Sequence, residues 1–160
     1  MRLVTTRRRF LAALVTVTFA LAPLDGATPA WANGHGMRRD GYVVIVNEQN
    51  GVPSAPRVLV SRFFLKKASH WDSGSLVLPV DLPAESLVRV AFSRHVLGKS
   101  VGSIKAYWQQ QIFSGREVPP PEKPDEADVL EFVKANRDAI AYVSPDAVLP
   151  RGVRVLIVTD

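Results

Sequence analysis

The sequence predicts an α/β sandwich, in which helices cover a largely parallel sheet. Two observations carry this prediction. Nearly continuous apolar runs occur at residues 42–46 and 139–143, and such runs are typical of strands that are covered on both faces. Segments with a helical spacing of apolar residues lie between these runs. The predicted order β, α, β, α, α, α, β, β is that of an α/β domain.

The first 32 residues are expected to be an export signal. A basic start is followed by an apolar run at residues 11–24, which is too short for a membrane-spanning helix. Residues 30–32 have the A-x-A form of a cleavage site, so the mature chain is expected to start at Asn33. Residues 6–11 (TRRRFL) resemble a twin-arginine signal, and a general secretory signal is the alternative. Both predict a periplasmic or otherwise exported protein.

The charge of the mature chain gives no indication of nucleic-acid binding. The whole chain has 20 basic and 15 acidic residues, for a net charge of +5. Residues 1–32 carry four of the basic and one of the acidic residues, so the remaining 128 residues carry 16 and 14, a net charge of +2. The chain has no cysteine, which excludes disulfides, thiolate chemistry and cysteine-ligated metals.

The remaining chain is long enough for one domain. Residues 33–41 are expected to form a flexible leader, and residues 42–160 the folded domain. Within the domain, the apolar run at residues 42–46 predicts the first strand. A helix is expected over residues 57–65, because Ser54 and Pro56 form a typical helix start. The next strand is expected over residues 76–80.

The segment that follows predicts an amphipathic helix capped by Ser86, whose hydroxyl can accept a backbone N–H of the first turn. One face is apolar and the other polar. The apolar face comprises Val88, Ala91, Phe92 and Val96, and the polar face Arg89, Ser93 and Arg94.

Two more helices and two strands complete the prediction. Ser100 is expected to cap a helix over residues 101–113, with Ile104, Trp108 and Ile112 on its apolar stripe. Phe92 and Trp108 are both predicted to be buried. An irregular proline-rich link, a helix and two strands follow, at residues 114–124, 125–135, 139–143 and 153–158.

The junction of the strand at 76–80 with the Ser86 helix is the best candidate for a ligand site. Unpaired N–H groups and the positive end of the helix dipole make a helix N-terminus suitable for an anion. Arg89 lies one turn inside this N-terminus, and Arg116 in Ser114-Gly115-Arg116 is a candidate second anion contact. A capped core helix without a ligand, and a helix C-cap followed by a solvated arginine, are the alternatives.

No catalytic residue, metal site or cofactor is predicted. His35, His70 and His95 have no metal-binding spacing, and the chain has no G-x-S-x-G or comparable nucleophile turn. The sequence therefore does not predict an enzyme.

Several motifs resemble those of the phosphate-binding proteins of ABC transporters. The motifs are VVIVNEQN at residues 43–50, FFLKK at 63–67 followed by Trp71, LGK at 97–99 and AIAYV at 139–143. The resemblance covers residues 42–158 and implies a periplasmic-binding-protein-like fold with three α/β/α layers and a parallel or mixed sheet. A complete receptor of that family has two lobes and about twice this length, so one lobe is expected here.

The resemblance also implies a phosphate site at the Ser86 turn, where the family has a Ser-Gly-Thr-Arg sequence. Aligned on Arg89, the first three positions are Ser86, Leu87 and Val88. Asp81 stands just before this turn, where its carboxylate would repel a dianion unless it takes up a proton or pairs with Arg89.

Two functions therefore remain open. The first is an exported domain that binds phosphate or another oxyanion and serves ABC-type phosphate transport. The second is a single-lobe interaction module without a ligand, which docks to a membrane sensor or transporter component, or pairs with itself. This module is expected to expose an apolar patch where the missing lobe would pack.

Overall fold

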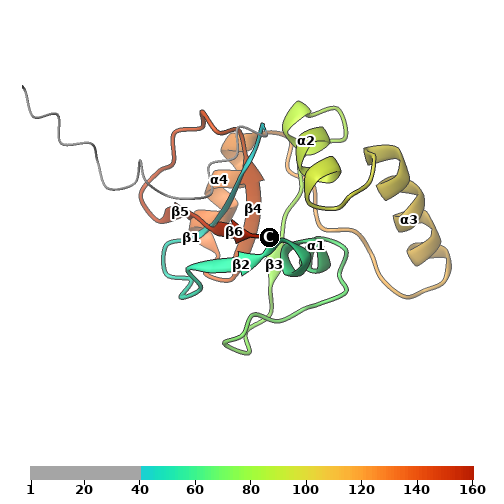
Figure 1. Cartoon of the computed structure of the whole chain (residues 1–160), viewed down its shortest axis with the longest axis horizontal. Helices are drawn as coiled ribbons and strands as arrows, with labels where there is room; N and C mark the ends of the chain where they lie inside the picture. Colours follow the sequence, from blue (N-terminus) through green and yellow to red (C-terminus); the bar gives the residue numbers. More distant parts are fainter. Residues whose placement is uncertain (1–40) are drawn as a thin grey trace, which may run out of the picture. The chain divides into compact units, whose positions relative to one another are not determined.

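A computed structural model describes residues 41–160 (Figure 1). The expected signal at residues 1–32 and most of the expected leader lie outside the described residues. Two sheets are present: β3–β4–β1–β5 and the pair β2–β6. The strands are β1 (Val43–Asn47), β2 (Ser54–Pro56), β3 (Leu78–Pro79), β4 (Ala139–Val143), β5 (Val153–Val155) and β6 (Ile157–Thr159). The helices are α1 (Arg57–Phe64), α2 (Leu87–His95), α3 (Val101–Phe113) and α4 (Glu126–Ala135).

The fold is mixed α/β, as predicted, and the larger sheet is mixed, the second of the two expected sheet types. Strand β1 pairs antiparallel with both β4 and β5, whereas β3 pairs parallel with β4. Every residue of β4 is buried. A continuous apolar run therefore correctly indicated a strand that is covered on both faces, but burial carries no information about strand direction.

Aromatic side chains from helices α1 and α2 pack against β4 and form the centre of the core. Phe92 stacks on Tyr142 with ring centroids 3.9 Å apart, and Phe64 contacts both rings. Trp108 packs in a second, smaller cluster with Ile104 and Leu65. The predicted burial of Phe92 and Trp108 is confirmed.

Helix α2 is rotated relative to the prediction. Arg89 and Ser93 were expected on the polar face, but both are buried together with Phe92 and Val96. These four positions follow the i, i+3, i+4, i+7 spacing of a single helix face. The polar members of this face were misassigned because their side chains find partners inside the protein, which the spacing of apolar residues does not reveal.

The short strands β2, β5 and β6 and the end of α3 differ from the sequence prediction. The expected strand at 153–158 is divided into β5 and β6 at Leu156, which is buried and donates its N–H to Val44. Strand β6 pairs parallel with β2, a short strand that was read only as a helix start. Ile112 is half exposed, because the described contacts of α3 are made through its first turns.

Candidate functional site

The predicted site lies where the chain leaves β3 and enters α2. Asp81 follows β3, and Arg89 is in the first turns of α2. The proline-rich link returns beside them, since Asp81 accepts from the N–H of Lys123 at 2.9 Å and donates its own N–H to Pro121 at 2.9 Å. These backbone bonds bring Glu122 into the site.

Arg89 points into the protein, where its guanidinium is surrounded by acceptors. Its Nη2 lies 3.1 Å from the Asp81 carboxylate, and its Nη1 lies 2.6 Å from the Glu122 carboxylate and also donates to the Leu82 carbonyl. The Arg89 side chain is only 7% exposed. Its Nε has no hydrogen-bond partner among residues 41–160.

The Asp81 carboxylate is the centre of the cluster. It accepts hydrogen bonds from the Tyr142 hydroxyl and from the Leu82 N–H. Burial raises the pKa of Asp81, and this effect exceeds the opposite effects of the Arg89 charge and of the Tyr142 hydrogen bond. Burial, together with the neighbouring Asp81 charge, also raises the pKa of Tyr142.

This arrangement is an internal ion-pair cluster, which we call the Arg89 cluster: Arg89, Asp81, Glu122 and Tyr142. One cation faces two carboxylates, so the positive charge that an oxyanion would need is already neutralised. The Asp81 carboxylate is buried, so an anion cannot easily displace it from Arg89. Glu122 is 52% exposed, and an exposed partner of this kind contributes little to stability. An incoming anion would therefore have to displace Glu122.

The three other predicted residues of the Ser86 turn lie next to this cluster, at or near the surface. Ser86 caps α2 by accepting the Arg89 N–H at 3.3 Å, as predicted. Leu87 is exposed and Val88 is partly buried. The hollow beside Ser86 has a volume of about 370 Å³, and its lining includes three acidic residues, Glu85, Asp125 and Glu126.

The structure does not bring Arg116 to the other predicted residues. It follows the end of α3, where its N–H donates to the Gln111 carbonyl at 3.1 Å. Its side chain is exposed and lines a hollow with Ile112, Glu117 and Val118. The helix-end alternative describes this position better than a second anion contact.

Sequence reasoning identified two members of the Arg89 cluster and missed two. Asp81 pairs with Arg89, which is one of the two possibilities that the sequence left open. Tyr142 was noted only as part of the AIAYV strand, and Glu122 carried no local signal, since only the returning link brings it to Arg89. In residues 41–160 there is no group of acidic, histidine or cysteine side chains suited to hold a metal ion, and no helix there is long and apolar enough to span a membrane.

No family model and no curated protein matches the chain, but several solved structures do. An ABC-type phosphate transport receptor from Vibrio cholerae matches with a TM-score of 0.58 and 16% identity, over 74% of this chain and 46% of that chain. A putative phosphate ABC transporter substrate-binding protein with bound phosphate, from Clostridium perfringens, matches with a TM-score of 0.58 and 20% identity, over 74% and 44%. PstS from Borrelia burgdorferi matches with a TM-score of 0.57 and 10% identity, over 74% and 47%.

The Vibrio structure is named as a receptor and the Clostridium structure as a substrate-binding protein, and none of the three is named as an enzyme. At these identities the likeness concerns the fold. The chain spans less than half the length of each of them, in agreement with the single lobe that the motifs predicted. The described residues thus have the fold of a part of the substrate-binding proteins of phosphate ABC transporters, a periplasmic-binding-protein fold.

Proposed function

We propose that this chain is an exported, single-lobe relative of the phosphate receptors, and that it binds a protein component of phosphate uptake rather than phosphate itself. The partner would be a transporter component or a sensor in the membrane. The observation that carries the proposal is the Arg89 cluster, because the arginine expected to hold an anion is held by two carboxylates of the same chain.

Charge around the predicted site supports this choice. A phosphate dianion at the Ser86 turn would meet the carboxylates of the adjoining hollow, with no basic side chain in that lining. Like charges at short range in a partly buried site disfavour binding. Replacement of the family's Gly and Thr by Leu87 and Val88 also removes a hydroxyl and the close approach of the backbone.

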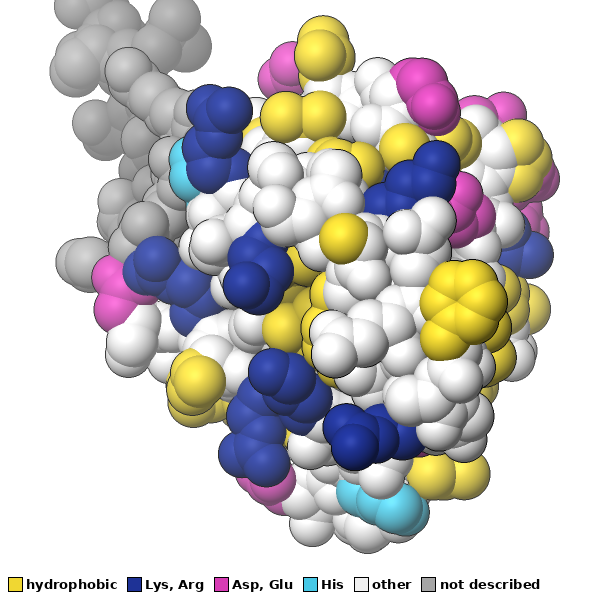
Figure 2. Space-filling model, turned by 90° about the vertical axis from the view of Figure 1, so that its right-hand side faces the viewer, with side chains coloured by type: hydrophobic (Ala, Val, Ile, Leu, Met, Phe, Trp, Pro, Cys, Tyr) yellow, Lys and Arg dark blue, Asp and Glu magenta, His cyan; other side chains and the backbone are white. Residues whose placement is uncertain are grey.

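Three exposed apolar side chains at the C-terminal end of α3 and in the link after it support a protein partner. We call these residues the Phe113 surface: Ile112, Phe113 and Val118. All three are exposed, and the Phe113 side chain is 91% exposed. Figure 2 faces the α3 side of the molecule and shows separate hydrophobic side chains among polar and basic ones. Exposed aromatic side chains in such positions are typical anchors of protein interfaces.

Photo-crosslinking in intact cells tests the proposal. A photoreactive residue placed at position 113 is expected to form an adduct with a membrane protein of phosphate uptake during phosphate limitation. Val148 is the matched control, since it is 89% exposed but lies in the connection between β4 and β5. An adduct of equal strength at both positions, or none at position 113, would contradict the proposal.

The same experiment examines export. Replacing Arg7 and Arg8 together with Lys is expected to keep the protein inside the cell if the route is twin-arginine, and the adduct at position 113 should then disappear. Continued export of this variant would point to the general secretory route.

The second candidate function is binding of an oxyanion, phosphate by likeness to the receptors. One observation favours it: Glu122 is half exposed and comes from an irregular link, so its carboxylate is the replaceable partner of Arg89. In this function Glu122 occupies the position of the anion until phosphate displaces it. The two candidates differ in what phosphate does to the stability of the folded protein.

A further inference from the structure

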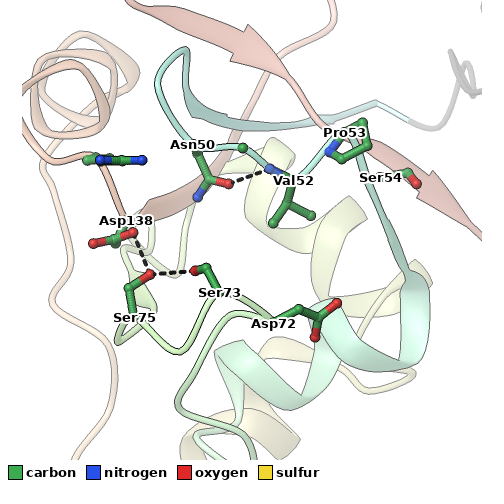
Figure 3. A pocket seen from close by; sticks show the side chains of 10 residues that line it. Asn50, Val52, Pro53, Ser54, Asp72, Ser73, Ser75 and Asp138 are labelled. Atoms are coloured by element: carbon green, nitrogen blue, oxygen red, sulfur yellow. Dashed lines mark hydrogen bonds between the residues drawn. The ribbon is translucent and has the colours of Figure 1, made fainter.

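A polar cavity of about 680 Å³ lies at the opposite end of the sheet from the Arg89 cluster. Figure 3 shows it between the turn after β1, the loop at residues 72–75 and the residues just before β4. The Arg89 cluster lies beyond the C-terminal end of β3. Since β3 and β4 are parallel, residues that precede β4 are at the other end of the sheet.

Asn50 forms part of the cavity wall and has an unmet hydrogen-bonding requirement. The residue is only 4% exposed. Its Oδ1 accepts the N–H of Val52 at 3.0 Å, which orients the side chain (Figure 3). Its Nδ2 is closed off from bulk solvent and has no acceptor in residues 41–160. Asn47, in contrast, donates from Nδ2 to two carbonyls at 2.9 Å. Buried donors without a partner are rare in folded proteins.

Opposite Asn50, the Asp138 carboxylate is held in a defined position. The Ser75 hydroxyl donates to its Oδ1 at 2.8 Å, and Ser73 lies 3.0 Å from Ser75 (Figure 3). The Trp71 indole donates to the Asp138 backbone carbonyl at 3.0 Å. The Asp138 Oδ2 is not used in these bonds. The Asn50 amide and the Asp138 carboxylate therefore line the same cavity from two different loops.

The charges of the lining define the kind of ligand. Arg137 is exposed and basic, while Asp72 and Asp138 are acidic. A dianion would be repelled by two carboxylates, and a neutral polyol would leave the charges unused. A zwitterion matches both signs, since its carboxylate can accept from amide and guanidinium N–H groups and its ammonium can donate to carboxylates.

We infer that this cavity binds a free α-amino acid. The ligand's carboxylate accepts hydrogen bonds from Arg137 and, after a small shift of the groups that now cover it, from Asn50 Nδ2. Its ammonium donates to the Asp138 carboxylate, with Asp72 supplying further negative charge. The side chain of the ligand occupies the open part of the cavity, whose size suits a small molecule. This site is separate from the Arg89 cluster and does not depend on the function proposed for it.

Nuclear magnetic resonance of the isotope-labelled exported chain tests this inference. The twenty common amino acids are added in pools, each compound at about 5 mM, enough to detect a dissociation constant in the millimolar range. At least one pool is expected to shift the backbone amide signals of Gly51, Ser73 and Ser75. Glucose and inorganic phosphate at the same concentration are expected to leave them in place.

Asn50→Asp is the sharpest variant, because the new carboxylate can still accept the Val52 N–H but no longer donates. It is expected to weaken binding at least tenfold. Gln49→Glu is the matched control: it makes the same change of charge one residue away, at an exposed position outside the lining, and should bind as the wild type does.

Arg137→Gln provides a second test at an exposed position, where folding is not at risk, and should also weaken binding at least tenfold. The inference is overturned if no pool shifts the signals. It is equally overturned if both variants bind like the wild type, or if glucose or phosphate produces the same shifts.

Discussion

At the scale of single residues, Asp81 stands out because its carboxyl group is buried. It is buried, accepts from Tyr142 and Leu82, and pairs with Arg89. Because burial penalises its charged form more strongly than these partners favour it, its pKa is raised. Folding therefore takes up a proton at Asp81 in the pH range between the unfolded pKa of about 3.9 and the raised folded value.

This uptake predicts a pH dependence of stability. The contribution of Asp81 is fully present below the unfolded pKa and is lost as the pH rises through the folded pKa. In that acid range, the free energy of unfolding of the wild type minus that of Asp81→Asn is expected to decrease with rising pH. Urea denaturation at a series of pH values measures it. Asp146→Asn, at an exposed position, is the control, and a flat difference for Asp81→Asn would show that its pKa is not raised.

At the scale of elements, α2 and α3 show how strongly helix orientation depends on tertiary partners. Helix α2 packs on β4 through Phe92, whose ring contacts Phe64, Tyr42 and Tyr142. Helix α3 ends in Phe113, which has the same chemistry and is almost fully exposed. The two residues therefore form a matched pair, with one ring in the core and the other in solvent.

Phe92→Ala is expected to lower the free energy of unfolding by about 3–5 kcal/mol, since it removes a buried ring and leaves a cavity. Phe113→Ala is expected to change it by less than about 0.5 kcal/mol, the usual range for surface substitutions. Urea denaturation of both variants measures the contrast. A loss below about 1 kcal/mol for Phe92→Ala would mean that α2 is oriented differently from the structure.

At the scale of the whole molecule, the effect of phosphate on thermal unfolding decides between the two candidate functions. If a protein is the ligand, phosphate should exceed chloride at matched ionic strength only by its general salting-out effect, which does not depend on the residues of the Arg89 cluster. If Arg89 binds phosphate with a millimolar dissociation constant, a hundredfold excess should stabilise by about 2.7 kcal/mol. For a domain of this size that is a rise of several degrees.

Glu122→Gln sharpens this comparison. The variant removes the half-exposed carboxylate from Arg89 and leaves the buried pair with Asp81 in place. The proposed function predicts that the rise produced by phosphate over chloride is the same in this variant as in the wild type. A phosphate-specific rise in the wild type that increases in Glu122→Gln would instead establish the oxyanion function.

Local patterns in the sequence were sufficient for most elements of the fold. The caps at Ser86 and Ser100 lie where their hydroxyls were expected to accept first-turn N–H groups. The apolar runs of β1 and β4 identified the buried strands, and the order of the motifs led to the phosphate-receptor fold. These features depend on neighbours within a few residues of each other, so the sequence alone carries them.

Strand direction, the inward face of α2 and the partners of Arg89 were decided only by the tertiary structure. Strand β1 pairs with residues about a hundred positions away, and Glu122 reaches Arg89 from a different segment of the chain. The spacing of residues along one helix distinguishes apolar from polar side chains. It cannot show that a buried arginine forms ion pairs with two carboxylates from other segments. The sequence by itself therefore determined the class of fold and two of the four residues of the Arg89 cluster, Arg89 and Asp81. Whether that site is open to an anion was decided by long-range contacts, because the energy of a buried charge depends on groups that only folding brings together.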